Sequence, residues 1–220
     1  MNSKMNIAEN LNHINNQLPE KVTLVAVSKT KPIQTILEAY NVGQRIFGEN
    51  KIQEMVDKYD DLPKDIEWHM IGHLQRNKVK YMAHFVKLIH GVDSFKTLVE
   101  INKQAQKHQR VINCLLQARI AKEDTKFGLP FDEIENILSS NELKDLDHVR
   151  IVGLMGMASF TTDLDQVKSE FKSLHTFFDK LKNMHPSFNT LSTGMSGDYK
   201  IAIDCGSTMV RVGSTIFGAR

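Results

Sequence analysis

The chain has 220 residues, 25% of them charged, and a formal net charge of +2, with lysines spread along its length, so the basic footprint of a nucleic-acid-binding protein is excluded. Its two cysteines, Cys114 and Cys205, exclude a disulfide scaffold and a Cys-rich zinc site, which fits a reducing compartment. The N-terminus lacks the apolar core of a signal peptide and no apolar run approaches membrane-spanning length, so we expect a soluble, cytoplasmic protein.

Helical and strand-like segments alternate along the whole chain. Apolar side chains at helical spacing predict a first helix at residues 5–17. Short apolar runs then predict eight strands, at 22–27, 45–50, 66–73, 86–93, 111–118, 150–157, 190–196 and 208–214. Helical patterns follow the first seven of them, at 33–40, 51–59, from 74 onward, 95–107, 131–138, 164–184 and 198–204.

This alternation predicts right-handed βαβ units and a parallel sheet. Eight such units favour closure into a single (β/α)₈ TIM-type barrel over residues 1–220, although a doubly wound open sheet has the same local pattern. Residues 215–220 are too few for an outer helix after the last strand. We expect the extra helix at residues 5–17 to cover that gap.

The first strand ends in a polar stretch that contains Lys29 and Lys31, just before Pro32 opens a helix. Ligands of parallel α/β folds bind at this edge, and a lysine there can form a Schiff base with a carbonyl. Most lysines are simply solvated, so Lys29 by itself indicates little.

Two glycine-containing turns, at residues 192–198 and 211–215, bear on the role of Lys29. Loops after strands seven and eight form the usual phosphate site of such barrels. Strand one neighbours strand eight, so Lys29 would share the barrel mouth with Arg211, Gly213 and Ser214. An amine beside a phosphate site suggests a phosphorylated aldehyde, and pyridoxal 5′-phosphate (PLP) is the candidate.

Six ordered motifs match one known family, and they lie at residues 26–32, 47–50, 68–78, 153–155, 191–196 and 206–218. Over nearly its full length the chain resembles the pyridoxal phosphate homeostasis proteins. The resemblance implies a barrel like the N-terminal domain of alanine racemase. It also implies a monomer that carries and buffers PLP inside the cell, possible delivery to PLP-dependent apo-enzymes, and no established reaction of its own.

The resemblance further implies a role for each matching residue. Lys29 would carry the cofactor as an internal aldimine, and Asn50 would lie near the ring. Arg211 would lie against the ring nitrogen, where a guanidinium donates its hydrogen bond and leaves that nitrogen unprotonated. Three residues would hold the phosphate and a further lysine would help cofactor exchange: Ser196, Gly213 and Ser214 for the phosphate, and Lys31 for exchange.

One position departs from the family pattern. Where the family usually shows Asn in an Asn-x-x-x-Glu-x-x-Lys-x-Gly motif, this chain has Arg119 before Glu123, Lys126 and Gly128. If Arg119 faces the pocket it adds a charge there; the alternative is that its guanidinium lies outward in solvent.

Two other patterns carry less weight. His69 and His73 are four residues apart, which suits a metal site on a helix, but this segment reads as a strand without an evident third ligand. Ser192 and Ser196 lack the Gly-x-Ser-x-Gly elbow of an acyl-transfer nucleophile.

Two alternative functions remain open from the sequence. A PLP-dependent amino-acid racemase of the same fold needs a proton donor on each face of the aldimine, and in alanine racemase one donor is a tyrosine from a second domain. None of the four tyrosines here is an evident partner for Lys29. An isomerase of sugar phosphates would use the phosphate site but would leave Lys29 without a cofactor.

Overall fold

The computed structural model describes residues 6–122 and 127–218, which form a closed barrel of eight parallel strands. The strands are β1 (Thr23–Val27), β2 (Ile46–Glu49), β3 (Glu67–Met70), β4 (Leu88–Val92), β5 (Ile112–Ala118), β6 (Val149–Gly156), β7 (Thr190–Ser192) and β8 (Met209–Val212). They pair in chain order, and β1 pairs with β8, so that Val25 lies beside Arg211. The predicted barrel is therefore confirmed, and the open-sheet alternative is wrong because the two sheet edges pair with each other.

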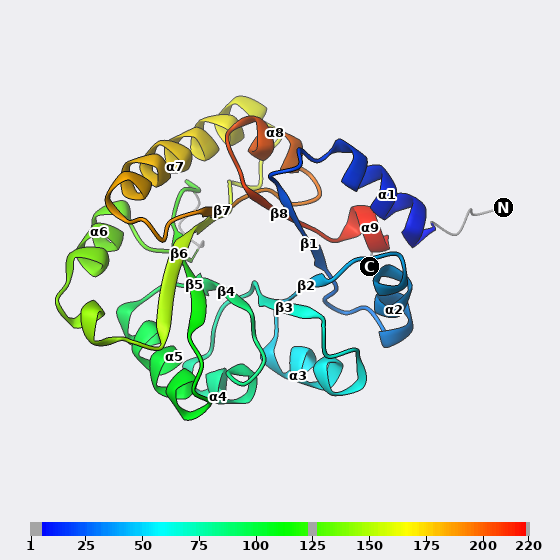
Figure 1. Ribbon diagram of the computed structural model, residues 1–220. Helices are drawn as coiled ribbons and strands as arrows, with labels where there is room; N and C mark the ends of the chain where they lie inside the picture. The colour runs from blue at the N-terminus through cyan, green and yellow to red at the C-terminus, as the bar shows by residue number, and fades with distance from the viewer. Residues whose placement is uncertain (1–5, 123–126, 219–220) are drawn as a thin grey trace.

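Helices surround the barrel, as Figure 1 shows. They are α1 (Ile7–Gln17), α2 (Ile33–Asn41), α3 (Ile52–Asp61), α4 (Val79–Met82), α5 (Phe95–Lys107), α6 (Phe131–Ser139), α7 (Leu164–Met184), α8 (Tyr199–Asp204) and α9 (Ser214–Phe217), with 3₁₀ turns at Arg76–Lys78 and Glu142–Asp145. Each long helix buries one apolar stripe against the outer face of the strands, as α7 does with Leu174, Phe178 and Leu181. Within the described parts of the chain, no helix has the length and apolar character needed to cross a membrane.

The extra N-terminal helix covers the place where an eighth outer helix would lie. Instead of a long helix, α9 follows β8, and Figure 1 shows α1 beside it. The Asn10 side chain donates a hydrogen bond to the carbonyl oxygen of Ile216 at 3.0 Å. The expected covering role of this helix is thus confirmed, although its predicted first residue, Met5, lies outside the described residues.

Several predicted strands are shorter than expected, β8 among them because Ser214 begins α9, and two others bear on the site. β3 ends at Met70 rather than at residue 73, because Gly72 packs its backbone against that of Asn50 and takes the chain into a loop. β7 ends at Ser192, and the rest of the predicted segment 190–196 forms a turn. In both cases the residues released from the strand lie at the barrel mouth, next to the site.

The interior of the barrel has two layers. Its apolar layer consists of the side chains Val25, Leu88, Leu115, Val152, Met155 and Met209. Two residues further along β4 and β8, on the same side of each strand, stand the buried polar side chains His90 and Arg211. The apolar layer thus closes the barrel below, and polar groups face the carboxyl ends of the strands.

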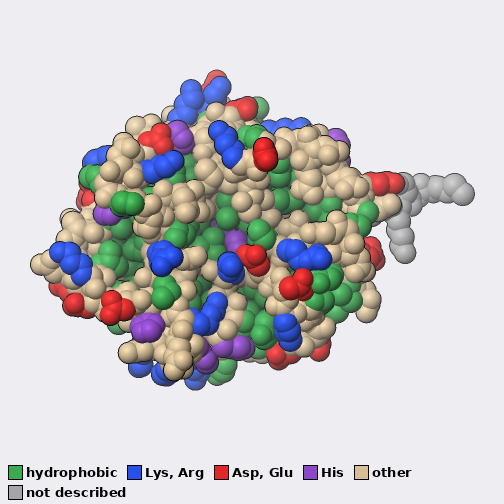
Figure 2. Space-filling model, in the orientation of Figure 1, with side chains coloured by type: hydrophobic (Ala, Val, Ile, Leu, Met, Phe, Trp, Pro, Cys, Tyr) green, Lys and Arg blue, Asp and Glu red, His purple; other side chains and the backbone are tan. Residues whose placement is uncertain are grey.

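Charged side chains are distributed without segregation on the face that Figure 2 shows, where Lys and Arg alternate with Asp and Glu. This agrees with the small net charge of +2. This face therefore offers no surface of a single charge to a ligand.

Candidate cofactor site

A cavity of about 520 Å³ opens at the carboxyl ends of the strands. All of the residues that the sequence nominated line it: Lys29, Lys31, Asn50, Ser196, Arg211, Gly213 and Ser214. They come from the ends of β1, β2, β7 and β8, where a (β/α)₈ barrel collects its ligand-binding groups. The structure thus brings these distant segments of the sequence together.

Lys29 reaches this cavity because of the alternation along β1. Val25 points into the barrel, whereas Ala26 belongs to the outer core. Continuing the alternation directs Ser28 outward and Lys29 inward, toward the cavity that it lines. The strand therefore fixes which of the neighbouring side chains can meet a ligand.

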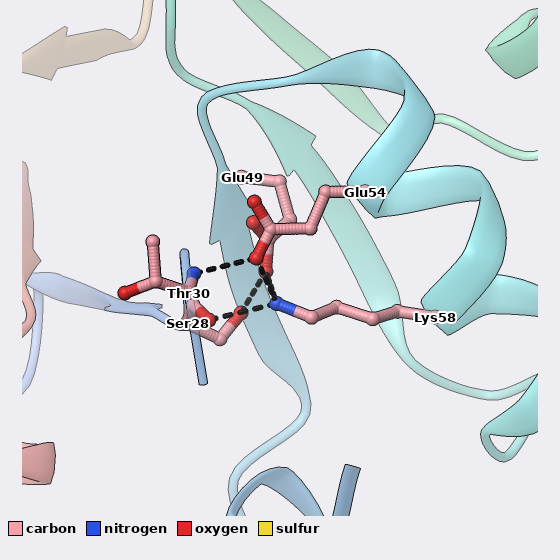
Figure 3. A network of polar contacts seen from close by, with 5 residues as sticks. All are labelled: Ser28, Thr30, Glu49, Glu54 and Lys58. Atoms are coloured by element: carbon pink, nitrogen blue, oxygen red, sulfur yellow. Dashed lines mark hydrogen bonds and ion pairs between the residues drawn. The ribbon is translucent and has the colours of Figure 1, made fainter. Parts of the chain in front are cut away.

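A polar network joins the end of β1 to β2 and α3, as Figure 3 shows. The Lys58 ammonium, on α3, donates hydrogen bonds to the carbonyl oxygen of Ser28 at 2.8 Å and to Glu49 Oε1 at 2.7 Å. The Ser28 hydroxyl donates to the same Glu49 oxygen at 2.6 Å. These contacts fix the residue that directly precedes Lys29.

The residue that follows Lys29 is held by the same network. Lys58 also donates to Glu54 Oε1 at 2.7 Å, and that oxygen accepts the Thr30 N–H at 2.5 Å. Thr30 has φ 65, a left-handed conformation that is uncommon for a β-branched residue and persists where its surroundings impose it. Both neighbours of Lys29 are therefore fixed by one cluster, which consists of Ser28, Thr30, Glu49, Glu54 and Lys58.

Glu49 is the most buried acid of this cluster, and its side chain has no exposed surface. Burial raises the pKa of Glu49, although Lys58 and the Ser28 hydroxyl act in the opposite direction. Its second oxygen, Oε2, is buried and has no hydrogen-bond partner among the described residues. The carboxylate therefore depends on Lys58 to remain charged.

Arg211 reaches the cavity from inside the barrel. Its Nη1 donates to the carbonyl oxygen of Ser192 at 2.8 Å and to the Ser192 hydroxyl at 2.5 Å, while Nη2 donates to the carbonyl oxygen of Gly156 at 3.2 Å. Burial lowers the pKa of Arg211 to about 10, against a raising effect of Asp198, so the guanidinium remains a cation at neutral pH. These bonds use three of its five N–H groups and leave two as donors toward a ligand.

The turns after β7 and β8 meet at the rim of the cavity next to the end of β1. The Gly213 N–H donates to the Ser196 hydroxyl at 3.2 Å. A Cβ atom at Gly213 would come within 3.1 Å of the carbonyl oxygen of Val27, so a larger residue there would crowd the strand end. Small residues and hydroxyl groups thus leave room for an anion beside Lys29.

Other lining residues were not nominated from the sequence. They are Val27, Thr30, Ile71, Gly72, His73, Gln117, Phe127, Met157, Met195, Gly197 and Gly218. Gln117 donates to the carbonyl oxygen of Phe127 at 3.1 Å. Most of them lie at or just after the carboxyl end of a strand. Their position after a predicted strand could therefore have identified them from the sequence.

His69 and His73, which are four residues apart, contact different residues. His69 points into the barrel, where its Nδ1 lies 3.1 Å from His90 Nε2. His73 stands at the mouth, stacks on Phe127 with 4.5 Å between ring centroids, and pairs with Asp93 at 3.4 Å. Among the described residues, no cluster of three His, Cys, Asp or Glu side chains has the arrangement of a metal site.

Arg119 is exposed and does not line the cavity, so of the two alternatives the outward one holds. Its N–H pairs with the carbonyl oxygen of Leu129 at 2.9 Å. Gly128 lies against the Ala118–Arg119 peptide with φ 134, where a Cβ would come within 2.8 Å of backbone atoms. The other two motif positions, Glu123 and Lys126, lie outside the described residues.

A family model and the curated relatives of the chain point to the same family. Residues 3–220 match the family model for the alanine racemase N-terminal domain. The chain is 39% identical to a pyridoxal phosphate homeostasis protein of Pasteurella multocida over 97% of this chain and 94% of that protein.

Solved structures give the same result. PipY of Synechococcus elongatus is 36% identical over 96% of this chain and 100% of its own, with TM-scores of 0.90 for the structure without PLP and 0.87 for the one with PLP bound. An alanine racemase of Clostridium difficile, 16% identical, has a TM-score of 0.78 over 98% of this chain and 57% of its own, a likeness that shows the fold alone.

Proposed function

The chain belongs to the family of pyridoxal phosphate homeostasis proteins, and we propose that it binds PLP in the cavity described above and serves in the homeostasis of that cofactor. We treat residues 1–220 as one PLP-binding domain. The observation that carries the proposal is the convergence in one cavity of an amine (Lys29), a buried guanidinium (Arg211) and a turn of hydroxyl groups and glycine. The recipients of the cofactor would be PLP-dependent enzymes in their cofactor-free form.

The residues present fit this cofactor. Ser196, Gly213 and Ser214 would hold the phosphate, because hydroxyl and backbone N–H donors bind phosphate oxygens. Arg211 would donate to the ring nitrogen through an N–H group that the protein leaves unused, and Asn50 would lie near the ring. When bound, PLP supplies an aldehyde that condenses with an amine.

Lys29 is the amine that we propose for this linkage. Its nitrogen would form a C=N bond with the aldehyde carbon, and the aldehyde oxygen would leave as water. Lys31 lines the same cavity, but its Nζ donates to the carbonyl oxygens of Phe217 and Gly218 at 3.1 and 3.2 Å. Lys31 is therefore assigned as an accessory amine, and Lys29 is assigned as the linking residue because the alternation along β1 directs it into the cavity.

A carrier function is favoured over that of a racemase. The relatives of similar length are named homeostasis proteins, whereas the likeness to alanine racemase concerns the fold alone. Among the described residues, no tyrosine lines the cavity, and Tyr199 directs its hydroxyl to Gln17 at 3.2 Å. A two-base racemase would need a second proton donor opposite Lys29.

Titration of the purified protein with PLP and with pyridoxal, followed by visible absorption, tests the proposal. We expect pyridoxal to bind at least tenfold more weakly, because charge-assisted hydrogen bonds contribute about 1.5–3 kcal/mol each and pyridoxal lacks the phosphate. The Ser196→Ala variant should bind PLP more weakly and pyridoxal with unchanged affinity, so the ratio of the two affinities should fall. Equal affinity for the two ligands, or racemase turnover near 1 per second, would contradict the carrier proposal.

A further inference from the structure

A chain of four buried polar side chains crosses the barrel beneath the cavity. His69 Nδ1 lies 3.1 Å from His90 Nε2, and His90 Nδ1 lies 3.0 Å from the Ser192 hydroxyl. That hydroxyl in turn lies 2.5 Å from Arg211 Nη1. The chain therefore joins β3, β4, β7 and β8 through side chains that are at most 3% exposed.

The direction of every hydrogen bond in this chain follows from its Arg211 end. A guanidinium has donors and no acceptor, so the Ser192 oxygen accepts from Arg211. The hydroxyl proton of Ser192 then needs an acceptor, because a buried donor without one is costly. Among the described residues, the acceptor within hydrogen-bond distance is His90 Nδ1.

The same reasoning fixes both imidazole rings. His90 accepts at Nδ1, so a neutral ring carries its proton on Nε2 and donates it to His69 Nδ1. His69 then also carries its proton on Nε2. Burial lowers the pKa of His69 to about 3, with a smaller effect from Lys87. Burial also lowers the pKa of His90 well below its ordinary value, so both rings are neutral.

We propose that His69, His90 and Ser192 are positioning residues for Arg211, which they hold as a hydrogen-bond donor aimed at the ligand in the cavity. All protons of the chain point away from Arg211. The chain therefore anchors one nitrogen of the guanidinium and cannot pass a proton to it. It also takes no proton from Arg211, because both imidazole rings are far weaker bases than the guanidine. The inference rests on the proposed function, in which Arg211 meets the ring nitrogen of PLP.

The chain also explains why Arg211 does not turn away from the cavity. Its Nη1 is held by both the hydroxyl and the carbonyl oxygen of Ser192, and the hydroxyl can accept only while its own proton has a place on His90. Without His90, the Ser192 hydroxyl would lose the acceptor that fixes the direction of its proton. Arg211 would then lose one of the bonds that fix its plane.

A double-mutant cycle tests this coupling. His90→Leu and Ser192→Ala should each weaken PLP binding by about tenfold, since each removes a hydrogen bond to a charged group or its support. The double variant should be no weaker than either single one, because both changes break the same chain. Additive losses of about a hundredfold would mean that the two residues act separately, and would overturn the proposal.

A packing control uses the same strand. Leu88 lies two residues before His90 in the apolar layer and beside His69 across the β3–β4 pair, so Leu88→Ala disturbs the packing next to the chain while leaving its hydrogen-bonding groups in place. It should lower thermal stability and leave PLP affinity within about twofold of the unmodified protein. If Leu88→Ala weakens PLP binding as much as His90→Leu does, the effect is one of packing and the proposal fails.

The tautomers can be read directly from the PLP-free protein, whatever the variants do. Long-range ¹H–¹⁵N NMR correlations of the imidazole rings should show His69 and His90 both protonated at Nε2 and both neutral at pH 7. A proton on Nδ1 of either ring would refute the direction of the chain. This NMR measurement does not depend on the proposed function. Failure of the unmodified protein to bind PLP would refute the proposed function and would leave the hydrogen-bond directions standing.

Discussion

Lys29→Ala is expected to lose all borohydride-stable pyridoxyl phosphate, while the unmodified protein gains one such group on the peptide that contains Lys29. Borohydride adds hydride to the carbon of the C=N bond and converts it to a secondary amine, which survives digestion and mass spectrometry. The physical reason is the geometry of β1, which directs Lys29 into the cavity beside Arg211 and the turn after β8. Intact and peptide mass spectrometry after incubation with PLP measure the adduct.

Lys31→Ala is the matched control for this experiment. Lys31 lines the same cavity and is two residues away, but its amine bonds to carbonyl oxygens at the end of α9. The Lys31→Ala variant should therefore keep the adduct on Lys29. An adduct that persists in Lys29→Ala at the level of the unmodified protein, or one found on a different lysine, would refute the assignment of Lys29.

Local sequence patterns predicted the alternating strands and helices and the residues at strand ends, whereas closure into a barrel was favoured only by the number of units. The continuous apolar run of β1 and the helical period of α5 and α7 are local properties, so their positions follow from short stretches of sequence. The placement of Lys29 and Arg211 at one mouth then follows from closure, which brings β1 beside β8. This part of the site could be predicted because it depends on strand order alone.

The polar contacts around these residues could not be predicted, because their partners are far apart in sequence. Ser192 lies 102 positions from His90, and Ser28 lies 30 from Lys58. The local sequence offered Ser192 only as a candidate nucleophile and His69 only as a candidate metal ligand. Barrel closure instead turns them into the inner support of Arg211. The outward direction of Arg119 likewise depends on the turn that Leu129 makes against its backbone.

The Lys58→Met variant is expected to lower the free energy of unfolding by about 3–5 kcal/mol, because it leaves Glu49 buried without its partner. For a chain of this size each kcal/mol corresponds to roughly 2–4 °C, so the melting temperature should fall by about 10 °C. Lys103→Met, at an exposed position of α5, is the matched control and should change stability by less than about 0.5 kcal/mol. Urea unfolding and thermal melting measure both.

The decrease in the free energy of unfolding caused by Lys58→Met should also depend on pH. Burial already raises the pKa of Glu49, and removal of Lys58 raises it further. A carboxyl whose pKa is raised by folding binds its proton more readily in the folded state, so stability falls as the pH rises from the unfolded pKa toward the folded one.

The deficit of Lys58→Met relative to the unmodified protein should therefore be smallest in acid, where Glu49 is protonated, and should grow toward neutral pH. Glu54, the other acid that faces Lys58, is partly exposed and contributes less. Adding Glu49→Gln to Lys58→Met removes the titrating group and should abolish this pH dependence. A deficit that is the same at every pH would mean that the variant loses packing rather than charge compensation, and the cluster behind Lys29 would then act by shape alone.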